Sequence, residues 1–137
     1  MNRLRWSPVL ATIAVVVFAT ISSFNLLVAQ QLAYKTISAS DARAMIQSSP
    51  NLLVVDVRTP EEYAQGHLAG AVNISLSDLP LRIGSLDPNR PILVYCRTGH
   101  RSAQASAILV NAGFTQVYNM AGGITAWINS GYPIVTS

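Results

Sequence analysis

The stretch ILVYCRTGHRS, residues 92–102, contains the only cysteine in this chain of 137 residues. The four apolar residues before Cys96 predict a buried strand. After the loop, apolar residues recur at the spacing of one helix face: Ala105, Ile108, Leu109 and Ala112. A helix is therefore expected to begin near Arg101, with Cys96 placed where the strand ends and a tight loop starts.

The neighbours of Cys96 favour a reactive thiolate. Backbone amides of such a loop point inward and bind anions, and the positive end of the helix dipole adds to this effect. Arg97 and Arg101 bring two cations, and Gly99 permits the backbone conformation that a short ring of amides requires. A lone cysteine after an apolar strand is more often an inert core residue. An inert residue does not need these neighbours, so we expect Cys96 to be a catalytic nucleophile.

Strands alternate with helices along the rest of the chain. Strands are expected at residues 35–37, 52–57, 71–74, 92–95 and 116–120. Helices are expected at residues 38–47 (capped by Ser38 or Ser40), 60–66, 77–86 (interrupted by Pro80), 101–112 and 123–129. This order predicts an α/β domain with a mainly parallel sheet and helices on both faces. Ligands in such folds bind beyond the carboxyl ends of the strands, where Cys96 and Asp56 both fall.

Several ordered motifs resemble those of the rhodanese (sulfurtransferase) family. They are CRTGHRS at residues 96–102, DVR at 56–58, PEEY at 60–63, GHLAGAVNI at 66–74 and GGITAW at 122–127. The resemblance extends from about Thr36 to Pro133 and implies a rhodanese-like fold. It also implies a sulfurtransferase that moves a sulfane sulfur from thiosulfate, or a similar anionic donor, to a thiol or cyanide acceptor. A protein that accepts the sulfur is a further expected partner.

In this reading Cys96 attacks the outer sulfur of the donor and carries it as a persulfide. The candidate substrate-binding residues are those that complete the loop: Arg97, Thr98, Gly99, His100, Arg101 and Ser102. Two alternatives stay open. One is a persulfide carrier or protein-docking module without enzymatic activity. The other is a phosphatase or arsenate reductase, which the six-residue length from Cys96 to Arg101 disfavours, because related phosphatase loops are one residue longer.

Residues outside the loop are expected to play mainly supporting roles. Asp56 either orients the loop or, as the preferred interpretation, caps the helix that follows it. Arg58 and Glu62 stand four positions apart and are interpreted as a structural ion pair. Arg101 either contacts the anion or ties the loop to the domain. His67 is expected to be structural and Trp127 to belong to the core, and the side chain of His100 is expected to face solvent.

Composition and charge narrow the class of partner. Half of the residues are hydrophobic and 11% are charged, with a formal net charge of +3. Arg3 and Arg5 are two of the nine basic residues, so seven basic residues face six acidic ones from Tyr34 onward. The sequence contains no basic stripe of the kind that binds nucleic acid, so a nucleic-acid partner is not expected. One cysteine and two separated histidines are poor zinc spacing, so neither a metal nor another cofactor is expected.

The first 30 residues are interpreted as a leader, followed by a linker at residues 31–35 and the domain at 36–137. Residues 9–29 form a run of 21 residues without charge, and as a helix it would reach about 31 Å, enough to cross a bilayer core. We favour an uncleaved transmembrane anchor, with the domain facing the periplasm or the cell exterior. The alternative is a signal peptide, with the domain secreted to the periplasm after cleavage.

Overall fold

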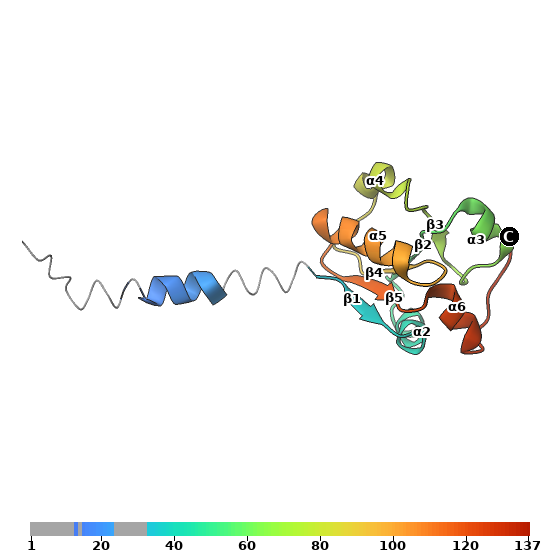
Figure 1. Cartoon of the computed structure of the whole chain (residues 1–137), viewed down its shortest axis with the longest axis horizontal. Coiled ribbons are helices and arrows are strands. Elements are labelled where there is room, and N and C mark those ends of the chain that lie inside the picture. The colour runs from blue at the N-terminus through green and yellow to red at the C-terminus, as the bar shows by residue number, and fades with distance from the viewer. Residues whose placement is uncertain (1–12, 14, 24–32) are drawn as a thin grey trace, which may run out of the picture. The chain divides into compact units, whose positions relative to one another are not determined.

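The computed structural model describes residue 13, residues 15–23 and residues 33–137 (Figure 1). The chain divides into two compact units, Met1–Leu32 and Ala33–Ser137. Residues 31 and 32 of the expected linker at 31–35, and residues 9–12, 14 and 24–29 of the expected membrane segment, lie outside the described residues. Each unit is therefore described by itself.

The described part of the leader is helical, at Ile13 and residues 15–23. The hydroxyls of Thr20 and Ser23 donate to backbone carbonyls of the preceding turn, those of Val17 and Ala19. The described stretches of the chain contain no helix long and apolar enough to cross a membrane. The expected N-terminal hydrophobic helix is not supported by the described residues.

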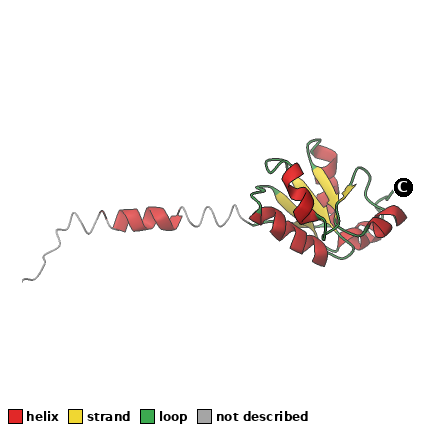
Figure 2. Ribbon diagram, turned by 90° about the horizontal axis from the view of Figure 1, so that it is seen from above, coloured by secondary structure: helices red, strands yellow, loops and turns green. Residues whose placement is uncertain are grey.

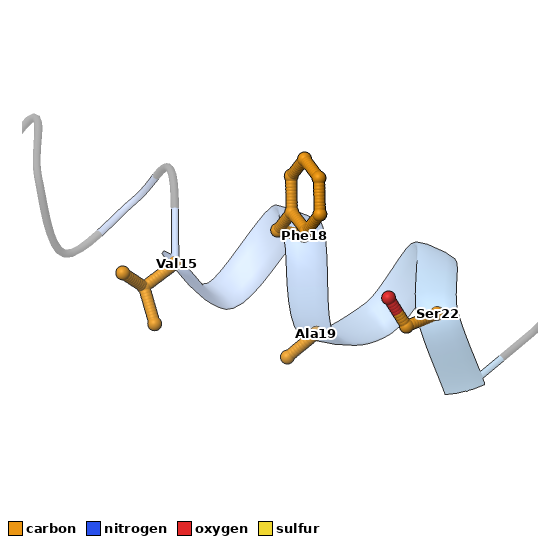
Figure 3. Close-up of a pocket in the computed structure, with 4 residues that line it drawn as sticks. All are labelled: Val15, Phe18, Ala19 and Ser22. Atoms are coloured by element: carbon orange, nitrogen blue, oxygen red, sulfur yellow. The ribbon is translucent and has the colours of Figure 1, made fainter.

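A hollow on the leader helix is lined by Val15, Phe18, Ala19 and Ser22 (Figure 3). These positions follow the i, i+3, i+4, i+7 spacing of neighbours on a helix surface. Since all four lining residues come from one short helix, the hollow is a feature of the helix surface, and we assign no ligand to it.

The second unit is built on a five-stranded sheet. Its strands are β1 (Lys35–Ile37), β2 (Leu53–Asp56), β3 (Val72–Asn73), β4 (Ile92–Tyr95) and β5 (Val117–Met120). The strand order is β1-β5-β4-β2-β3, and every neighbouring pair is parallel. In the register of the central strands Asp56 lies beside Tyr95, so the carboxyl ends of β2 and β4 meet at one edge. The expected parallel sheet is confirmed.

The helices are α2 (Ala39–Ser48), α3 (Pro60–Gln65), α4 (Leu79–Arg82), α5 (His100–Asn111) and α6 (Gly123–Asn129). Local sequence explains most of their bounds. Ser38 caps α2 by accepting the amide of Asp41, and Pro60 occupies the first turn of α3. The expected helix at residues 77–86 is shorter, because four residues of α4 pass directly into a 3₁₀ turn, η1 (Ile83–Ser85).

Two apolar clusters cover the two faces of the sheet. In one, residues of α4 and α5 pack on the sheet: Leu79, Ala105, Leu109 and Val110 against Val55, Ile92 and Val94. In the other, residues of α2 and α6 pack on it: Ala39, Ala42, Ile124 and Trp127 against Val54, Leu93 and Met120. The arrangement of helices around the strands is visible in Figure 2. Helices on both faces, as expected, leave the carboxyl edge of the sheet to the loops.

Candidate active site

Cys96 lies directly after β4 and is almost fully buried, with 1% of its surface exposed. Gly99, which directly precedes α5, has a φ of +107°, a conformation that favours glycine. This turn lets the Gly99 amide donate to Cys96 Sγ at 3.0 Å. The Ser102 hydroxyl donates to the same sulfur at 3.4 Å. The sulfur is therefore held by donors from a loop and from the first turn of a helix, as the sequence predicted in outline.

These donors set the protonation of the thiol. Burial acts to raise the pKa of Cys96, but hydrogen bonds from the Ser102 hydroxyl and from the backbone amides of Ser102, Gly99 and Thr98 outweigh it. The net effect is a pKa below the ordinary thiol value. Because a thiolate is the nucleophilic form, this geometry supplies the chemistry that the loop sequence indicated.

The two arginines of the loop differ in what they contact. Arg101 donates through Nη1 and Nη2 to the two carboxylate oxygens of Glu62, at 2.8 and 2.9 Å. It therefore ties the loop to α3, one of the two roles considered for it. Arg97 is exposed and forms no ion pair with any residue in 33–137. The thiolate is stabilised chiefly by amides and a hydroxyl, rather than by two guanidinium groups.

The predicted ion pair between Arg58 and Glu62 is wrong. Arg58 Nη2 instead lies 2.6 Å from Asp56 Oδ2 and also donates to the Gly66 carbonyl at 2.7 Å. Arg58 and Asp56 are both buried, so the pair desolvates two charges together. Asn73 donates to the carbonyls of Asp56 and Arg58, which fixes this segment further.

The preferred role of Asp56, capping the next helix, is also wrong. Asp56 is the last residue of β2, and Thr59 caps α3 with its hydroxyl while Glu62 accepts the Thr59 amide. The carboxylate of Asp56 accepts hydrogen bonds from the backbone amide and guanidinium of Arg58. It does not reach the Cys96 loop through any hydrogen bond among residues 33–137. Asp56 and Arg58 therefore shape the loop after β2.

A pair of glycines at the start of α6, Gly122 and Gly123, packs directly against the Cys96 loop. The amide of Ile124 donates to the Cys96 carbonyl at 2.9 Å, and that of Thr125 to the Arg97 carbonyl at 3.2 Å. A β-carbon on Gly123 would overlap the carbonyl oxygen of Cys96 and lie 2.6 Å from the carbonyl carbon of Arg97. Only a glycine allows this approach, so residues 122–125 act as the outer wall of the loop.

The histidines and Trp127 lie as expected. The ring of His67 stacks on Tyr63, with 3.7 Å between centroids, and its Nδ1 lies 2.9 Å from the Tyr63 carbonyl oxygen. His100 is exposed at the start of α5. Trp127 is buried in the core and donates to the Pro133 carbonyl. Within the described part of the chain no group of three or more His, Cys, Asp or Glu residues is placed to hold a metal.

Sequence reasoning missed three features of the site: the partner role of Glu62, the close approach of Gly123 and the direct hydrogen bond from Ser102 to the sulfur. A signal was present for Ser102, because the sixth residue after Cys96 falls in the first helical turn. The paired glycines at 122–123 also signalled a close backbone approach. For Glu62 there was no local signal, since 39 positions separate it from Arg101.

Comparison with protein families gives a match over most of the chain. The model of the rhodanese-like domain matches residues 38–130. A sulfurtransferase of Allochromatium vinosum is 40% identical over 90 residues, which cover 66% of this chain and 84% of the relative. The thiosulfate sulfurtransferase GlpE of Stutzerimonas stutzeri is 37% identical over 100 residues, covering 73% and 89% of the two chains.

Solved structures show the same fold. A rhodanese-related protein from Thermoplasma volcanium superposes with a TM-score of 0.69 and 36% identity, covering 76% of this chain and all of the other. The polysulfide-sulfur transferase from Wolinella succinogenes, a homodimer, gives a TM-score of 0.65 and 32% identity. It covers 85% of this chain and 89% of that one.

Proposed function

Because this chain belongs to the rhodanese-like domain family, we propose that it transfers sulfane sulfur through a persulfide on Cys96. The donor is thiosulfate or a similar small anion, and the acceptor is a thiol or cyanide. The observation that carries the proposal is the placement of Cys96 Sγ, which accepts the Gly99 amide at 3.0 Å and the Ser102 hydroxyl at 3.4 Å. Related sulfurtransferases, which this chain matches over 84% and 89% of their length, support it.

The first half-reaction forms one sulfur–sulfur bond and breaks another. The Cys96 thiolate attacks the outer sulfur of thiosulfate, and the bond between that sulfur and the sulfonate breaks. Sulfite leaves with the electron pair, and Cys96 carries the persulfide. The inward-facing amides and the Ser102 hydroxyl stabilise negative charge on the thiolate before attack and on the persulfide after it.

The loop residues have separate roles in this proposal. Arg97, Thr98 and His100 are exposed in the segment that follows Cys96 and are proposed to contact the anionic donor. Gly99 and Ser102 hold the sulfur directly. Arg101 positions the loop through Glu62 and offers its remaining N–H groups to an anion.

Loop size separates sulfur transfer from phosphoryl chemistry. Residues 96–101 form a loop of six residues, and Gly99 closes it onto the sulfur. A ring this small suits a single sulfur atom better than a tetrahedral phosphate or arsenate. Insertion of one glycine between His100 and Arg101 should therefore reduce sulfur transfer. A wild-type protein that hydrolyses aryl phosphates as fast as it transfers sulfur would contradict this argument.

Intact-mass measurement tests the proposed reaction. Incubation of the full-length chain with thiosulfate should add the mass of one sulfur atom, and cyanide should remove it as thiocyanate. Cys96→Ser should abolish both changes, because a serine hydroxyl is barely ionised at neutral pH and cannot carry the sulfur. A wild-type chain that is alkylated at Cys96 but never gains sulfur would favour the docking-module alternative.

We further propose that the leader anchors the domain to a membrane, with the domain on the periplasmic or outer side. The support is the uncharged run at residues 9–29, preceded by Arg3 and Arg5. The protein should remain with membranes after a carbonate wash and keep its original N-terminus. Recovery in the soluble fraction, with a new N-terminus between about residues 20 and 30, would identify a cleaved signal peptide instead.

A further inference from the structure

A cavity of about 340 Å³ opens beside the Cys96 loop, in the same unit of the chain. It is lined by Val57, Thr59, Ser75, Leu76, Ser77 and Arg101. Its volume falls in the range of small-molecule sites. Nothing in the sulfur-holding geometry of Cys96 accounts for it, because the donors to the sulfur come from residues 99 and 102.

Two connections join this cavity to the nucleophile. Arg101 belongs both to the cavity wall and to the first turn of α5, next to Ser102. Its pKa is raised, first by the hydrogen bonds to Glu62 and also by the negative charge of Cys96. Val57 donates its amide to the carbonyl of Tyr95, the residue before Cys96, at 3.0 Å. Two residues of the cavity wall are therefore attached to the segment that carries Cys96: Arg101 through the chain and Val57 through this hydrogen bond.

The hydroxyl wall of the cavity presents oxygen acceptors. The hydroxyl of Ser75 donates to Asp78 Oδ2 at 2.9 Å, so the 3.1 Å contact between Ser75 and Ser77 has Ser77 as the donor. The hydroxyl of Thr59 donates to Glu62 Oε2 at 3.2 Å. Each hydroxyl proton is thus engaged. The oxygens of Thr59 and Ser75 also accept one hydrogen bond each, from the Glu62 amide and from Ser77, so each keeps one lone pair for a ligand and Ser77 keeps both. The carboxylates of Glu62 and Asp78 accept the hydroxyl protons of Thr59 and Ser75. This side of the cavity therefore favours a ligand group that donates hydrogen bonds or carries positive charge.

Arg101 gives the cavity a second side, which favours a negatively charged ligand group. Two of its N–H groups bind Glu62, and a guanidinium carries five. The others match the planar oxygens of a ligand carboxylate. A small dianion such as thiosulfate suits this cavity poorly, since Glu62 and Asp78 stand behind its walls. A ligand with one carboxylate and one amine matches both sides.

From this pattern we infer that the cavity is the acceptor subsite and takes a small thiol amino acid, with its carboxylate at Arg101 and its amine at the hydroxyls of Thr59, Ser75 and Ser77. This inference rests on the proposed sulfur transfer. Val57 and Leu76 supply the apolar surface against which the methylene of such a thiol packs.

The second half-reaction then follows from the position of the ligand. The acceptor sulfur attacks the outer sulfur of the Cys96 persulfide, and a new bond forms between those two atoms. The bond from Cys96 Sγ to the outer sulfur breaks, and its electron pair returns to Cys96 as thiolate. The proton of the acceptor thiol ends on the transferred sulfur. The loop amides that stabilise the thiolate make Cys96 a good leaving group.

A cavity-filling variant tests the subsite. Ser77→Phe places a large side chain at an exposed position of the cavity wall, and Ser48→Phe places the same side chain at an exposed position at the end of α2, which packs on the other face of the sheet. Persulfide is loaded with thiosulfate on the full-length chain, and its discharge is timed separately with cyanide and with L-cysteine. We expect Ser77→Phe to slow discharge by cysteine about tenfold, equivalent to about 1.4 kcal/mol, and to leave loading and cyanide discharge unchanged.

Three thiols test the contributions of the carboxylate and the amine of the acceptor separately. L-cysteine should discharge the wild-type persulfide faster than cysteamine, which lacks the carboxylate, and faster than 3-mercaptopropionate, which lacks the amine. Ser77→Phe should remove this preference, and Ser48→Phe should keep it. Equal discharge by cysteine in Ser77→Phe and wild type would overturn the inference. Equal slowing of loading and discharge would assign the cavity to the donor instead and would also overturn it.

A binding measurement tests the acceptor subsite independently of sulfur transfer. S-methyl-L-cysteine cannot accept sulfur, so its binding does not depend on a persulfide. It should shift the backbone amide resonances of Thr59, Ser75, Leu76 and Ser77 in wild type and Ser48→Phe, but not in Ser77→Phe. Failure of wild type to load sulfur would contradict the proposed function alone. Absence of these shifts would overturn the subsite, whether or not sulfur is transferred.

Discussion

Arg101 and Glu62, 39 positions apart in the sequence, are joined by two parallel hydrogen bonds of 2.8 and 2.9 Å. The same carboxylate accepts the backbone amide of Thr59 and completes the capping box of α3. One side chain thus connects the helix after β2 with the helix after Cys96. The relationship explains how the carboxyl ends of two neighbouring strands carry loops of fixed relative position.

The first prediction isolates the charge of this pair. Glu62→Gln keeps an oxygen that can accept the Thr59 amide and loses the negative charge that Arg101 requires. The two side chains are 29% and 35% exposed, so screening is appreciable, and we expect a loss of about 0.5–1 kcal/mol in the free energy of unfolding. Urea denaturation measures it. Glu61→Gln, in the same helical turn, is the control and should change the free energy little. An equal loss in both variants would contradict the assignment.

The second prediction concerns the loss of folding stability at acidic pH. Hydrogen bonds from Arg101 are the largest cause that lowers the pKa of Glu62, from an ordinary value of 4.5 to about 2. The unfolded chain therefore binds more protons than the folded one between these values, and stability falls as the pH is lowered through that window. The contribution of Glu62 is complete above about pH 4.5. Denaturation at a series of pH values should show a shallower acid slope for Glu62→Gln than for wild type. Parallel slopes would refute the prediction.

The third prediction concerns the hydroxyl that contacts the sulfur. Burial acts to raise the pKa of Cys96, and the Ser102 hydrogen bond is the largest effect opposing it. Ser102→Ala should therefore raise the pKa of the thiol and slow alkylation of Cys96 by iodoacetamide near neutral pH. Ser106→Ala is the matched control, because Ser106 is also buried on α5 but donates to the Ser102 carbonyl. A rate profile against pH that is identical in wild type and Ser102→Ala would show that amides alone hold the thiolate.

The fourth prediction concerns the wall of the loop. Gly123→Ala introduces a β-carbon that overlaps the Cys96 carbonyl, at a residue with a φ of +55°. We expect a loss of about 3 kcal/mol or more in unfolding free energy, or a displaced loop with slower alkylation of Cys96. Gly131→Ala separates the causes, because Gly131 also has a positive φ, +78°, but open space around it. It should show only the smaller conformational cost. Equal losses would mean that the close approach to the loop is unimportant.

Much of the fold could be predicted because its signals are local. The apolar runs before Asp56 and Cys96 indicated the central strands, and the alternation with helices indicated a parallel sheet. Ser38 and Pro60 marked helix starts correctly, since capping and proline geometry depend on residues within one turn. The short helix α4 was overestimated because apolar spacing does not show where an α-helix passes into a 3₁₀ turn.

The candidate site was predictable only in part. The position of Cys96 between a strand and a helix followed from the sequence, and the structure adds the two donors to its sulfur. Both arginines were assigned to the binding of the anionic donor, because the spacing of residues does not show in which direction a side chain points. The structure turns Arg101 toward Glu62, and no such partner is described for Arg97.

The sequence by itself determined the local chemistry: one cysteine, a six-residue loop, a glycine that can turn it and a helix that follows. Only the tertiary structure decided which charges pair. Arg58 and Glu62 are four positions apart, but Arg58 precedes α3, which begins at Pro60, so the helical rule for such pairs does not apply to them. The parallel sheet instead brings the ends of β2 and β4 together, which places Glu62 within reach of Arg101, while Arg58 turns back to Asp56 at the end of its own strand.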